Sequence, residues 1–118
     1  MKKKILIIDD EAPIRLLYKE ELEDEGYNVI TAGDFQSGFE KIKTFIPDLV
    51  ILDIKMPGTS GLEALQKYKN FNNDLKIILC SAYSDFKNEF VTWAADDYIV
   101  KSLDLSILKE SIKEILAK

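Results

Sequence analysis

The chain alternates between short apolar runs and longer segments in which apolar residues recur every three or four positions. The short runs predict five β-strands, at residues 4–8, 28–32, 49–52, 77–80 and 98–100. Three of these runs are almost continuously apolar, which is typical of strands that are covered on both faces in a parallel sheet.

The segments between and after these strands predict five amphipathic helices. Their apolar stripes run, in chain order, through Ile14 to Leu22, Phe35 to Phe45, Leu62 and Leu65, Phe86 to Trp93, and Leu105 to Ile115. Pro13 suits the first turn of the first helix, and Gly26 ends that helix. The third helix is expected to be shorter than the others, unless Tyr68 extends its apolar stripe. The fourth helix is expected at about 85–95.

This strict alternation predicts an α/β fold, with residues 1–118 forming one domain around a doubly wound five-stranded parallel sheet and helices on both faces. Right-handed crossovers leave few topologies, and the expected strand order is 2-1-3-4-5. Ligands bind such sheets at the carboxyl ends of the strands, beside the reversal between strands one and three. The residues that end the strands are therefore the candidates for chemistry.

Four of the five predicted strands end in a polar or charged side chain. Asp9 and Asp10 follow the first strand, Asp53 the third, Ser81 the fourth and Lys101 the fifth. Two carboxylates about 5 Å apart repel each other by roughly 3 kcal/mol at an effective dielectric constant of about 20. Such a cluster shifts a pKa or binds a cation. Because all the ligand atoms are oxygens, a hard cation such as Mg²⁺ is favoured.

Lys101 would offset the acidic charge and hold a phosphoryl oxygen, and Ser81 would supply a hydroxyl donor. With Asp53 as the nucleophile, these groups compose a phosphoryl-transfer site. Each residue also has a plainer interpretation. Asp9 and Asp10 suit a helix cap, Asp53 and Ser81 suit turns at strand ends, and Lys101 suits a solvated lysine at a strand end. Their joint placement at one edge of the sheet favours the site.

Composition narrows the function classes further. Apolar residues make up 47% of the chain and charged residues 31%, as in globular proteins. The net charge of −5 argues against binding to a nucleic-acid backbone. The absence of histidine excludes a Ser-His-Asp triad and most zinc sites, and the lone Cys80, expected in the core, forms no internal disulfide. No apolar run suits a membrane span or a signal peptide, so we expect a cytoplasmic protein.

Four stretches, in this order and spacing, resemble the receiver domain of bacterial two-component response regulators. They are Ile7-Ile8-Asp9-Asp10, the segment 49–58 (Leu-Val-Ile-Leu-Asp-Ile-Lys-Met-Pro-Gly), Ser81-Ala82, and Asp96-Asp97-Tyr98-Ile99-Val100-Lys101. The resemblance covers essentially the whole chain and implies a flavodoxin-like fold. It also implies that Asp53 is phosphorylated by a phosphohistidine on a sensor histidine kinase or a histidine phosphotransfer protein.

The same resemblance implies the ligands and the moving parts of the site. Asp10, Asp53 and the backbone carbonyl of Lys55 would ligate Mg²⁺, and Asp9 would contact it mainly through water. Ser81 and Tyr98 would form a switch pair, with Ser81 moving toward the phosphoryl group and the Tyr98 ring turning inward. The switch would remodel the surface of the fourth helix, fifth strand and fifth helix, where an effector would dock.

Several positions vary from the usual family pattern or flank the site. Ser102 follows Lys101 where the family usually has a proline after a cis peptide bond, and a non-proline cis bond costs about 2.5–4 kcal/mol. The aim of Lys101 is therefore in question. Ala94 stands where glycine is common. Lys55 and Tyr83 together are similar to the corresponding residues in single-domain receivers of sporulation-type phosphorelays. Either Tyr83 shields the phosphoryl group from water, or both side chains point outward.

Other function classes fit the sequence less well. An aspartate-based phosphohydrolase usually carries its nucleophile after the first strand and adds a cap domain, for which 118 residues leave no room. A flavodoxin-like cofactor binder needs a phosphate loop after that strand, where Asp9-Asp10-Glu11 would repel phosphate. A receiver-like interaction domain that acts without phosphorylation has Ser102 as its supporting feature. The leading interpretation is a signalling module that is not an enzyme with a separate substrate.

Overall fold

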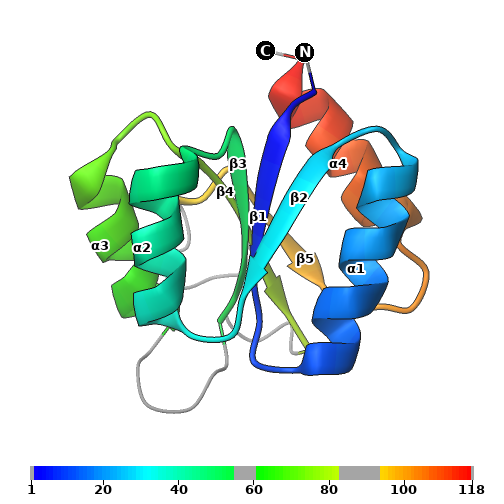
Figure 1. Cartoon of the computed structure of the whole chain (residues 1–118), viewed down its shortest axis with the longest axis horizontal. Coiled ribbons are helices and arrows are strands. Elements are labelled where there is room, and N and C mark those ends of the chain that lie inside the picture. The colour runs from blue at the N-terminus through cyan, green and yellow to red at the C-terminus, as the bar shows by residue number, and fades with distance from the viewer. Residues whose placement is uncertain (1, 55–60, 83–93, 118) are drawn as a thin grey trace.

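The computed structural model describes residues 2–54, 61–82 and 94–117. Within these ranges the elements follow in the order β1 (Lys4–Ile8), α1 (Ala12–Asp24), β2 (Asn28–Ala32), α2 (Phe35–Phe45), β3 (Leu49–Asp53), α3 (Gly61–Phe71), β4 (Lys76–Ser81), β5 (Asp97–Val100) and α4 (Ser106–Leu116). The strands form one parallel sheet in the order β2-β1-β3-β4-β5, which confirms the predicted fold class and topology (Figure 1).

The predicted strands are all present, and β3, β4 and β5 extend slightly beyond their predicted ends. The shorter length expected for the third helix was wrong, because α3 has 11 residues and is as long as α2. Tyr68 continues the apolar stripe of α3 and is 1% exposed, so its burial extends the helix. The helix expected at about 85–95 falls mostly on residues 83–93, which lie outside the described ranges, and it stays a prediction.

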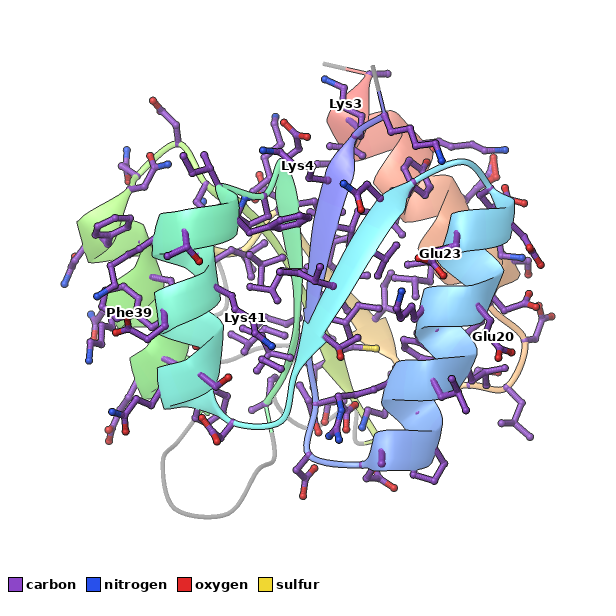
Figure 2. All side chains as sticks on the ribbon, viewed as in Figure 1. Lys3, Lys4, Glu20, Glu23, Phe39 and Lys41 are labelled. Atoms are coloured by element: carbon purple, nitrogen blue, oxygen red, sulfur yellow. The ribbon has the colours of Figure 1, made fainter. Side chains whose placement is uncertain are left out.

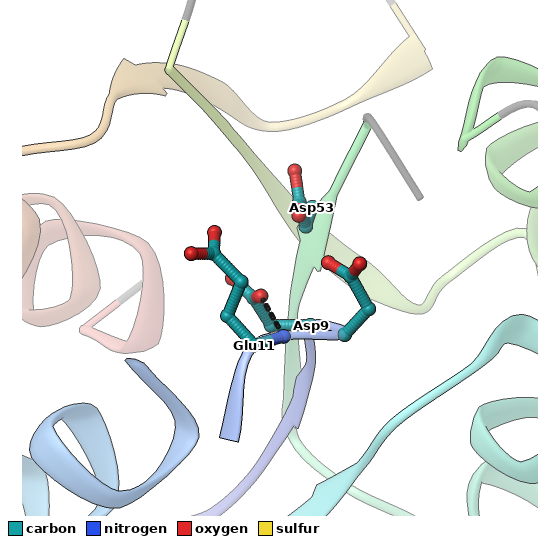
Figure 3. Close-up of side chains that lie close together, drawn as sticks. Asp9, Glu11 and Asp53 are labelled. Atoms are coloured by element: carbon teal, nitrogen blue, oxygen red, sulfur yellow. Dashed lines mark hydrogen bonds between the residues drawn. The ribbon is translucent and has the colours of Figure 1, made fainter. Parts of the chain in front are cut away.

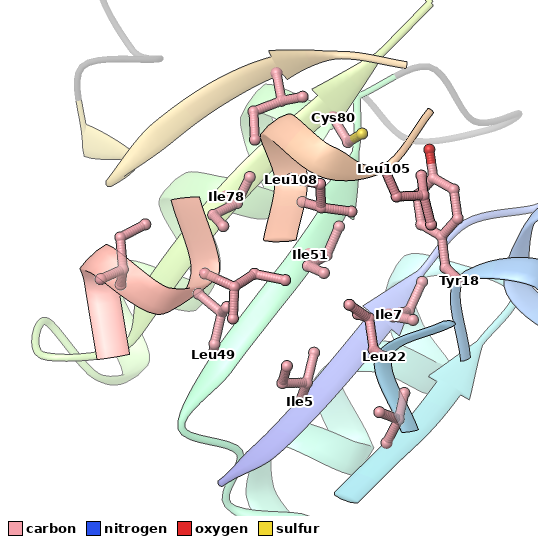
Figure 4. Packing of buried hydrophobic residues seen from close by; sticks show 14 residues of the cluster. Ile5, Ile7, Tyr18, Leu22, Leu49, Ile51, Ile78, Cys80, Leu105 and Leu108 are labelled. Atoms are coloured by element: carbon pink, nitrogen blue, oxygen red, sulfur yellow. The ribbon is translucent and has the colours of Figure 1, made fainter. Parts of the chain in front are cut away.

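The sheet separates two hydrophobic layers, since successive side chains of a strand point to opposite faces. Ile5 and Ile7 of β1 face the layer covered by α1 and α4, which Figure 4 shows together with Tyr18 and Cys80. Leu6 and Ile8 face the layer covered by α2 and α3. All residues of β1 after Lys4 are buried, as predicted for a strand covered on both sides.

Cys80 is a core residue, as predicted, and is 2% exposed. Burial raises the pKa of its thiol to about 11, so the side chain is a neutral thiol at physiological pH. No helix within the described ranges combines the length and apolar character that crossing a membrane requires.

The sheet register decides which strand ends become neighbours. Ile8 pairs with Leu52, and Asp53 pairs with Cys80. Asp9 therefore leaves β1 beside Asp53 at the end of β3, at the point where the winding of the sheet reverses.

Tyr68 supplies a test of packing on the α2–α3 side. Its hydroxyl donates a hydrogen bond to the buried backbone oxygen of Phe35 at 2.7 Å. Replacing Tyr68 by Phe is expected to lower the free energy of unfolding by about 1 kcal/mol at neutral pH, measured by urea denaturation. Tyr27→Phe is the matched control, because the half-exposed Tyr27 hydroxyl makes no hydrogen bond among the described residues.

The effect of Tyr68→Phe is also expected to depend on pH. Burial, and then the negative charge of Asp34, raises the pKa of the Tyr68 hydroxyl above its ordinary value of 10.0. In the unfolded chain this group loses its proton near pH 10, whereas in the folded protein it stays neutral. Stability from Tyr68 is therefore complete below about pH 10 and declines as the pH rises further. The difference between wild type and Tyr68→Phe should shrink at about pH 10.5; a constant difference would contradict this account.

Candidate functional site

Four acidic residues gather at the carboxyl ends of β1 and β3. Asp9 and Asp53 are buried, with 3% and 4% exposure, whereas Asp10 and Glu11 are exposed. One carboxylate oxygen of each residue lies within 4.8 Å of the corresponding atoms of the others. Figure 3 shows Asp9, Glu11 and Asp53 converging from the two strands. The structure thus brings together the three aspartates that the sequence predicted to be neighbours.

Lys101, from the loop after β5, reaches into this acidic cluster. Its Nζ lies 2.8 Å from Asp9 Oδ2 and 3.1 Å from Asp53 Oδ2. Glu11 Oε1 is 3.3 Å from the same atom. Burial alone would lower the pKa of Lys101, but the hydrogen bond to Asp9 and the charges of Asp53 and Asp9 outweigh burial and raise it. The side chain is therefore an ammonium ion that bridges the carboxylates.

The backbone holds Lys101 in this direction without a cis peptide bond. Its N–H donates to the backbone oxygen of Ser81 at 2.6 Å, which continues the hydrogen bonding of β5 with β4. The bond between Lys101 and Ser102 is trans, as are all peptide bonds of the described residues. Because Nζ still reaches Asp53, the serine at position 102 does not disturb the aim of this lysine.

Asp9 is oriented by three contacts. Its Oδ1 accepts a hydrogen bond from the Glu11 N–H at 2.9 Å, while Oδ2 faces Lys101. Arg15 Nη1 donates to the backbone oxygen of Asp9 at 2.7 Å. The N-cap of α1 is Glu11, without a side-chain capping bond, so the interpretation of Asp9 and Asp10 as helix caps is wrong.

Glu11 and Arg15 take part in the site although neither was predicted as a site residue. Glu11 directly follows the acidic pair, and Arg15 lies one helical turn later, so that α1 carries both back toward the cluster. This spacing in the sequence could have indicated that Glu11 and Arg15 lie near the acidic cluster. Only the fold shows that the Glu11 side chain turns toward Lys101.

Ser81 and Tyr98 occupy neighbouring strands. Ser81 ends β4 and is 0% exposed, one position beyond the residue that pairs with Asp53. Tyr98 of β5 is half-buried and packs against the hydrophobic layer under α2 and α3. Lys55 and Tyr83, which the sequence placed beside the site, lie outside the described residues, so their roles stay predictions.

The acidic cluster suits a hard divalent cation by the chemistry of its donors. All four candidate ligand atoms are carboxylate oxygens, which is the donor type of Mg²⁺ and Ca²⁺ sites. The two buried carboxylates need positive charge nearby, and Lys101 supplies only one such charge. A cation bound here would balance the excess of negative charge.

Gly61, at the start of α3, approaches the residue that follows Asp53. Its N–H donates to the backbone oxygen of Ile54 at 3.1 Å, and an added Cβ would overlap the Ile54 backbone. We expect Gly61→Ala to lower the free energy of unfolding by about 1–3 kcal/mol in urea denaturation, because the backbone of Ile54 would have to move to make room for the added Cβ. Gly33→Ala is the control, since its Cβ would meet only the flexible Arg15 side chain. Equal losses in the two variants would contradict the argument.

Sequence comparisons identify similar proteins. A family profile described as the response regulator receiver domain matches residues 5–113. Sporulation initiation phosphotransferase F of Bacillus subtilis is 32% identical over 118 residues, which cover 98% of this chain and 95% of that protein. Response regulator ArlR of Staphylococcus aureus is 37% identical over 117 residues, which cover 98% of this chain and 53% of ArlR. The chain thus spans nearly all of one relative and about half of the other.

Solved structures agree with the observed fold. Response regulator TrrA of Thermotoga maritima, in complex with Mg²⁺-BeF, superposes with a TM-score of 0.92 at 47% identity, covering 96% of this chain and 98% of TrrA. The structure of histidine kinase ThkA in complex with TrrA gives a TM-score of 0.91 at 47% identity, covering 97% of this chain and 98% of that chain. The flavodoxin-like fold extends over almost the whole length.

Proposed function

Because the chain belongs to the response regulator receiver family of two-component signalling, we propose that Asp53 accepts a phosphoryl group from a phosphohistidine donor. The observation that carries the proposal is the Asp53 carboxylate, which is 4% exposed and lies 3.1 Å from the Lys101 ammonium. The donor would be a sensor histidine kinase or a histidine phosphotransfer protein. The complex of the similar protein TrrA with the kinase ThkA supports this class of partner.

The proposed transfer is a displacement at phosphorus. A carboxylate oxygen of Asp53 attacks the phosphoryl group, the P–N bond to the donor imidazole breaks, and the imidazole keeps that electron pair and takes up a proton. The product is an acyl phosphate on Asp53. Lys101 lies where it can pair with the added phosphoryl oxygens, and the buried Ser81 hydroxyl supplies a further donor.

We assign Mg²⁺ binding to Asp9, Asp10, Asp53 and the backbone carbonyl of Lys55. The oxygen-only donor set and the Mg²⁺-BeF complex of the similar protein TrrA support this assignment. Bound Mg²⁺ would neutralise carboxylate charge and phosphoryl charge during transfer. Glu11 also lies within the acidic cluster and adds to its negative potential.

Ser81 and Tyr98 form the proposed switch. After transfer, Ser81 would move toward the phosphoryl group and the half-buried Tyr98 ring would turn inward, because the two residues lie on the adjacent strands β4 and β5. This change would remodel the surface of the predicted helix at about 85–95, β5 and α4, where an effector would dock.

In this proposal the chain is a signalling module that forms one domain over residues 1–118, and it is not an enzyme with a separate substrate. Its cytoplasmic location stays a prediction. The alternative is an interaction domain that acts without phosphorylation. The position of Lys101 favours phosphorylation over this alternative. This lysine reaches Asp53 although Ser102 replaces the usual proline.

The test uses the unmodified protein and acetyl phosphate as a small donor, with and without Mg²⁺. Intact-mass spectrometry is expected to find one added phosphoryl group per chain, and only when Mg²⁺ is present. Chelation of the metal before addition of the donor should prevent the adduct. If acetyl phosphate has no effect, a phosphorylated histidine phosphotransfer protein is the second donor. Failure with both donors would favour the phosphorylation-independent interaction domain.

A further inference from the structure

The outer surface of α2 and α3 carries two neighbouring hollows. One has a volume of about 560 Å³ and lies between the helices beside Phe35 and Phe39. The other has a volume of about 200 Å³ and lies beside Ile46 and Phe71 at the ends of the same helices. Lys43 lines both of them. We call this surface the α2–α3 face, and its members are Phe39, Glu40, Lys43, Ile46, Glu63, Lys67 and Phe71.

An aromatic group joins the two helices on this face. The Phe39 ring stacks on Tyr68, with centroids 5.7 Å apart, and meets the edge of Phe71 at 5.4 Å. Lys43 and Lys67 place their Nζ atoms 4.8 and 4.9 Å from the centre of the Phe39 ring. Figure 2 shows Phe39 in the region where α2 and α3 lie side by side. The two lysines are attracted to the face of the ring, and aromatic residues are enriched where protein surfaces meet.

Ile46 projects from the same face in an unfavourable backbone conformation. It is the C-cap of α2, with φ of 52° in the left-handed region, and it is 67% exposed. Glycine or asparagine is usual at such a cap, and a β-branched residue is an outlier there. The isoleucine side chain gains little burial within the monomer. Its apolar surface, together with that of the 51% exposed Phe71, is available for another molecule.

The charges of the face are balanced, unlike those of the whole molecule. Two glutamates and two lysines surround the aromatic group, so their formal charges cancel, whereas the chain as a whole carries −5. Glu40 and Lys43 also pair directly at 3.0 Å. Copies of this acidic chain would repel each other through most surfaces, but that repulsion is locally absent at the α2–α3 face.

We propose that the α2–α3 face binds the same face of a second copy of this chain. The apolar projections, Ile46 and Phe71, and the larger hollow beside Phe35 lie at different heights along the same pair of helices. In the proposed two-fold arrangement the projections of each copy would enter the hollow of the other. Glutamates and lysines then face each other around the contact.

This association leaves the acidic site accessible. Helices α2 and α3 cover one face of the sheet, whereas α1 and α4 cover the opposite face (Figure 1). The acidic cluster lies at the strand ends, between the two layers. The proposed contact depends neither on Mg²⁺ nor on phosphorylation of Asp53, so its test is separate from that of the proposed function.

Sedimentation velocity of the whole chain, without Mg²⁺ or a phosphoryl donor, tests the contact. Wild-type protein is expected to show a reversible monomer–dimer equilibrium with a dissociation constant of about 100 µM, as suits a small contact area. Ile46→Asn should weaken association at least about tenfold. The same change should raise the urea midpoint, since asparagine adopts the left-handed conformation readily. A merely destabilised variant would not show both effects.

Ile107→Asn is the matched control. Ile107 is a comparably exposed isoleucine, at 70%, on α4 across the sheet, so this change should leave association unaltered. Wild-type protein that stays monomeric up to about 1 mM would overturn the proposal. Association that is unchanged in Ile46→Asn would also overturn the proposal. If only Ile107→Asn lost association, the contact would be assigned to α4 instead.

Discussion

Asp53→Asn is expected to lose phosphoryl acceptance from either donor, with a rate at least about a thousandfold below that of wild type. The amide has nearly the same shape as the carboxylate, but its oxygen is a far weaker nucleophile and carries no charge. Asp9 still pairs with Lys101 at 2.8 Å, so the lysine keeps a partner in the variant. The expected loss of phosphoryl acceptance would therefore come from removal of the nucleophile and not from disruption of the site.

Intact mass after incubation with acetyl phosphate and Mg²⁺ measures this effect. Asp74→Asn is the matched control, because Asp74 is exposed in the turn before β4 and its substitution should leave the adduct unchanged. Circular dichroism should report the same secondary structure for both variants. An adduct of undiminished yield on Asp53→Asn would move the acceptor to another residue.

Lys101→Met is expected to have two large effects. Methionine keeps much of the length of the lysine but has no charge, so phosphoryl acceptance should fall by about 100- to 1000-fold. The buried carboxylates of Asp9 and Asp53 would also lose the cation that now lies 2.8 and 3.1 Å from them. The free energy of unfolding without Mg²⁺ should therefore fall by about 3–5 kcal/mol.

Mg²⁺ separates this electrostatic explanation from a loss of packing. Because the metal ion would replace the missing positive charge, it should raise the thermal midpoint of Lys101→Met more than that of wild type. Lys109→Met removes a more exposed ion pair, with Glu21 at 2.9 Å, and should change the free energy of unfolding little, with no effect of Mg²⁺. If Mg²⁺ raised the thermal midpoints of wild type and Lys101→Met equally, the electrostatic explanation would be contradicted.

Local patterns were sufficient to predict most of the fold. Continuous apolar runs can be buried on both faces only within a covered sheet, and the alternating helices supply that cover. The third helix was expected to be short from Leu62 and Leu65, and the extension that Tyr68 offered is the one the structure has. The burial of Tyr68 depends on the Phe35 oxygen that accepts its hydrogen bond, and this contact joins residues 33 positions apart.

The candidate site, like the fold, was predicted only in part from the sequence. The sequence predicted that Asp9 and Asp53 would meet, because residues that end neighbouring parallel strands lie at one edge of the sheet. It could not predict that Glu11 would turn toward Lys101, since the direction of an exposed side chain depends on what surrounds it. The effect of Ser102 on Lys101 was also open until the backbone was seen.

The sequence by itself determined the five strands and the types of residue at their carboxyl ends, because hydrophobic periodicity is local. It also predicted the order of the sheet, because right-handed crossovers leave few topologies for a parallel sheet. Only the tertiary structure decided that one ammonium ion bridges Asp9 and Asp53, that Glu11 joins them, and that Ile46 projects beside Phe71. These features bring together side chains far apart in the chain. Their geometry follows from packing between elements, which local spacing does not encode.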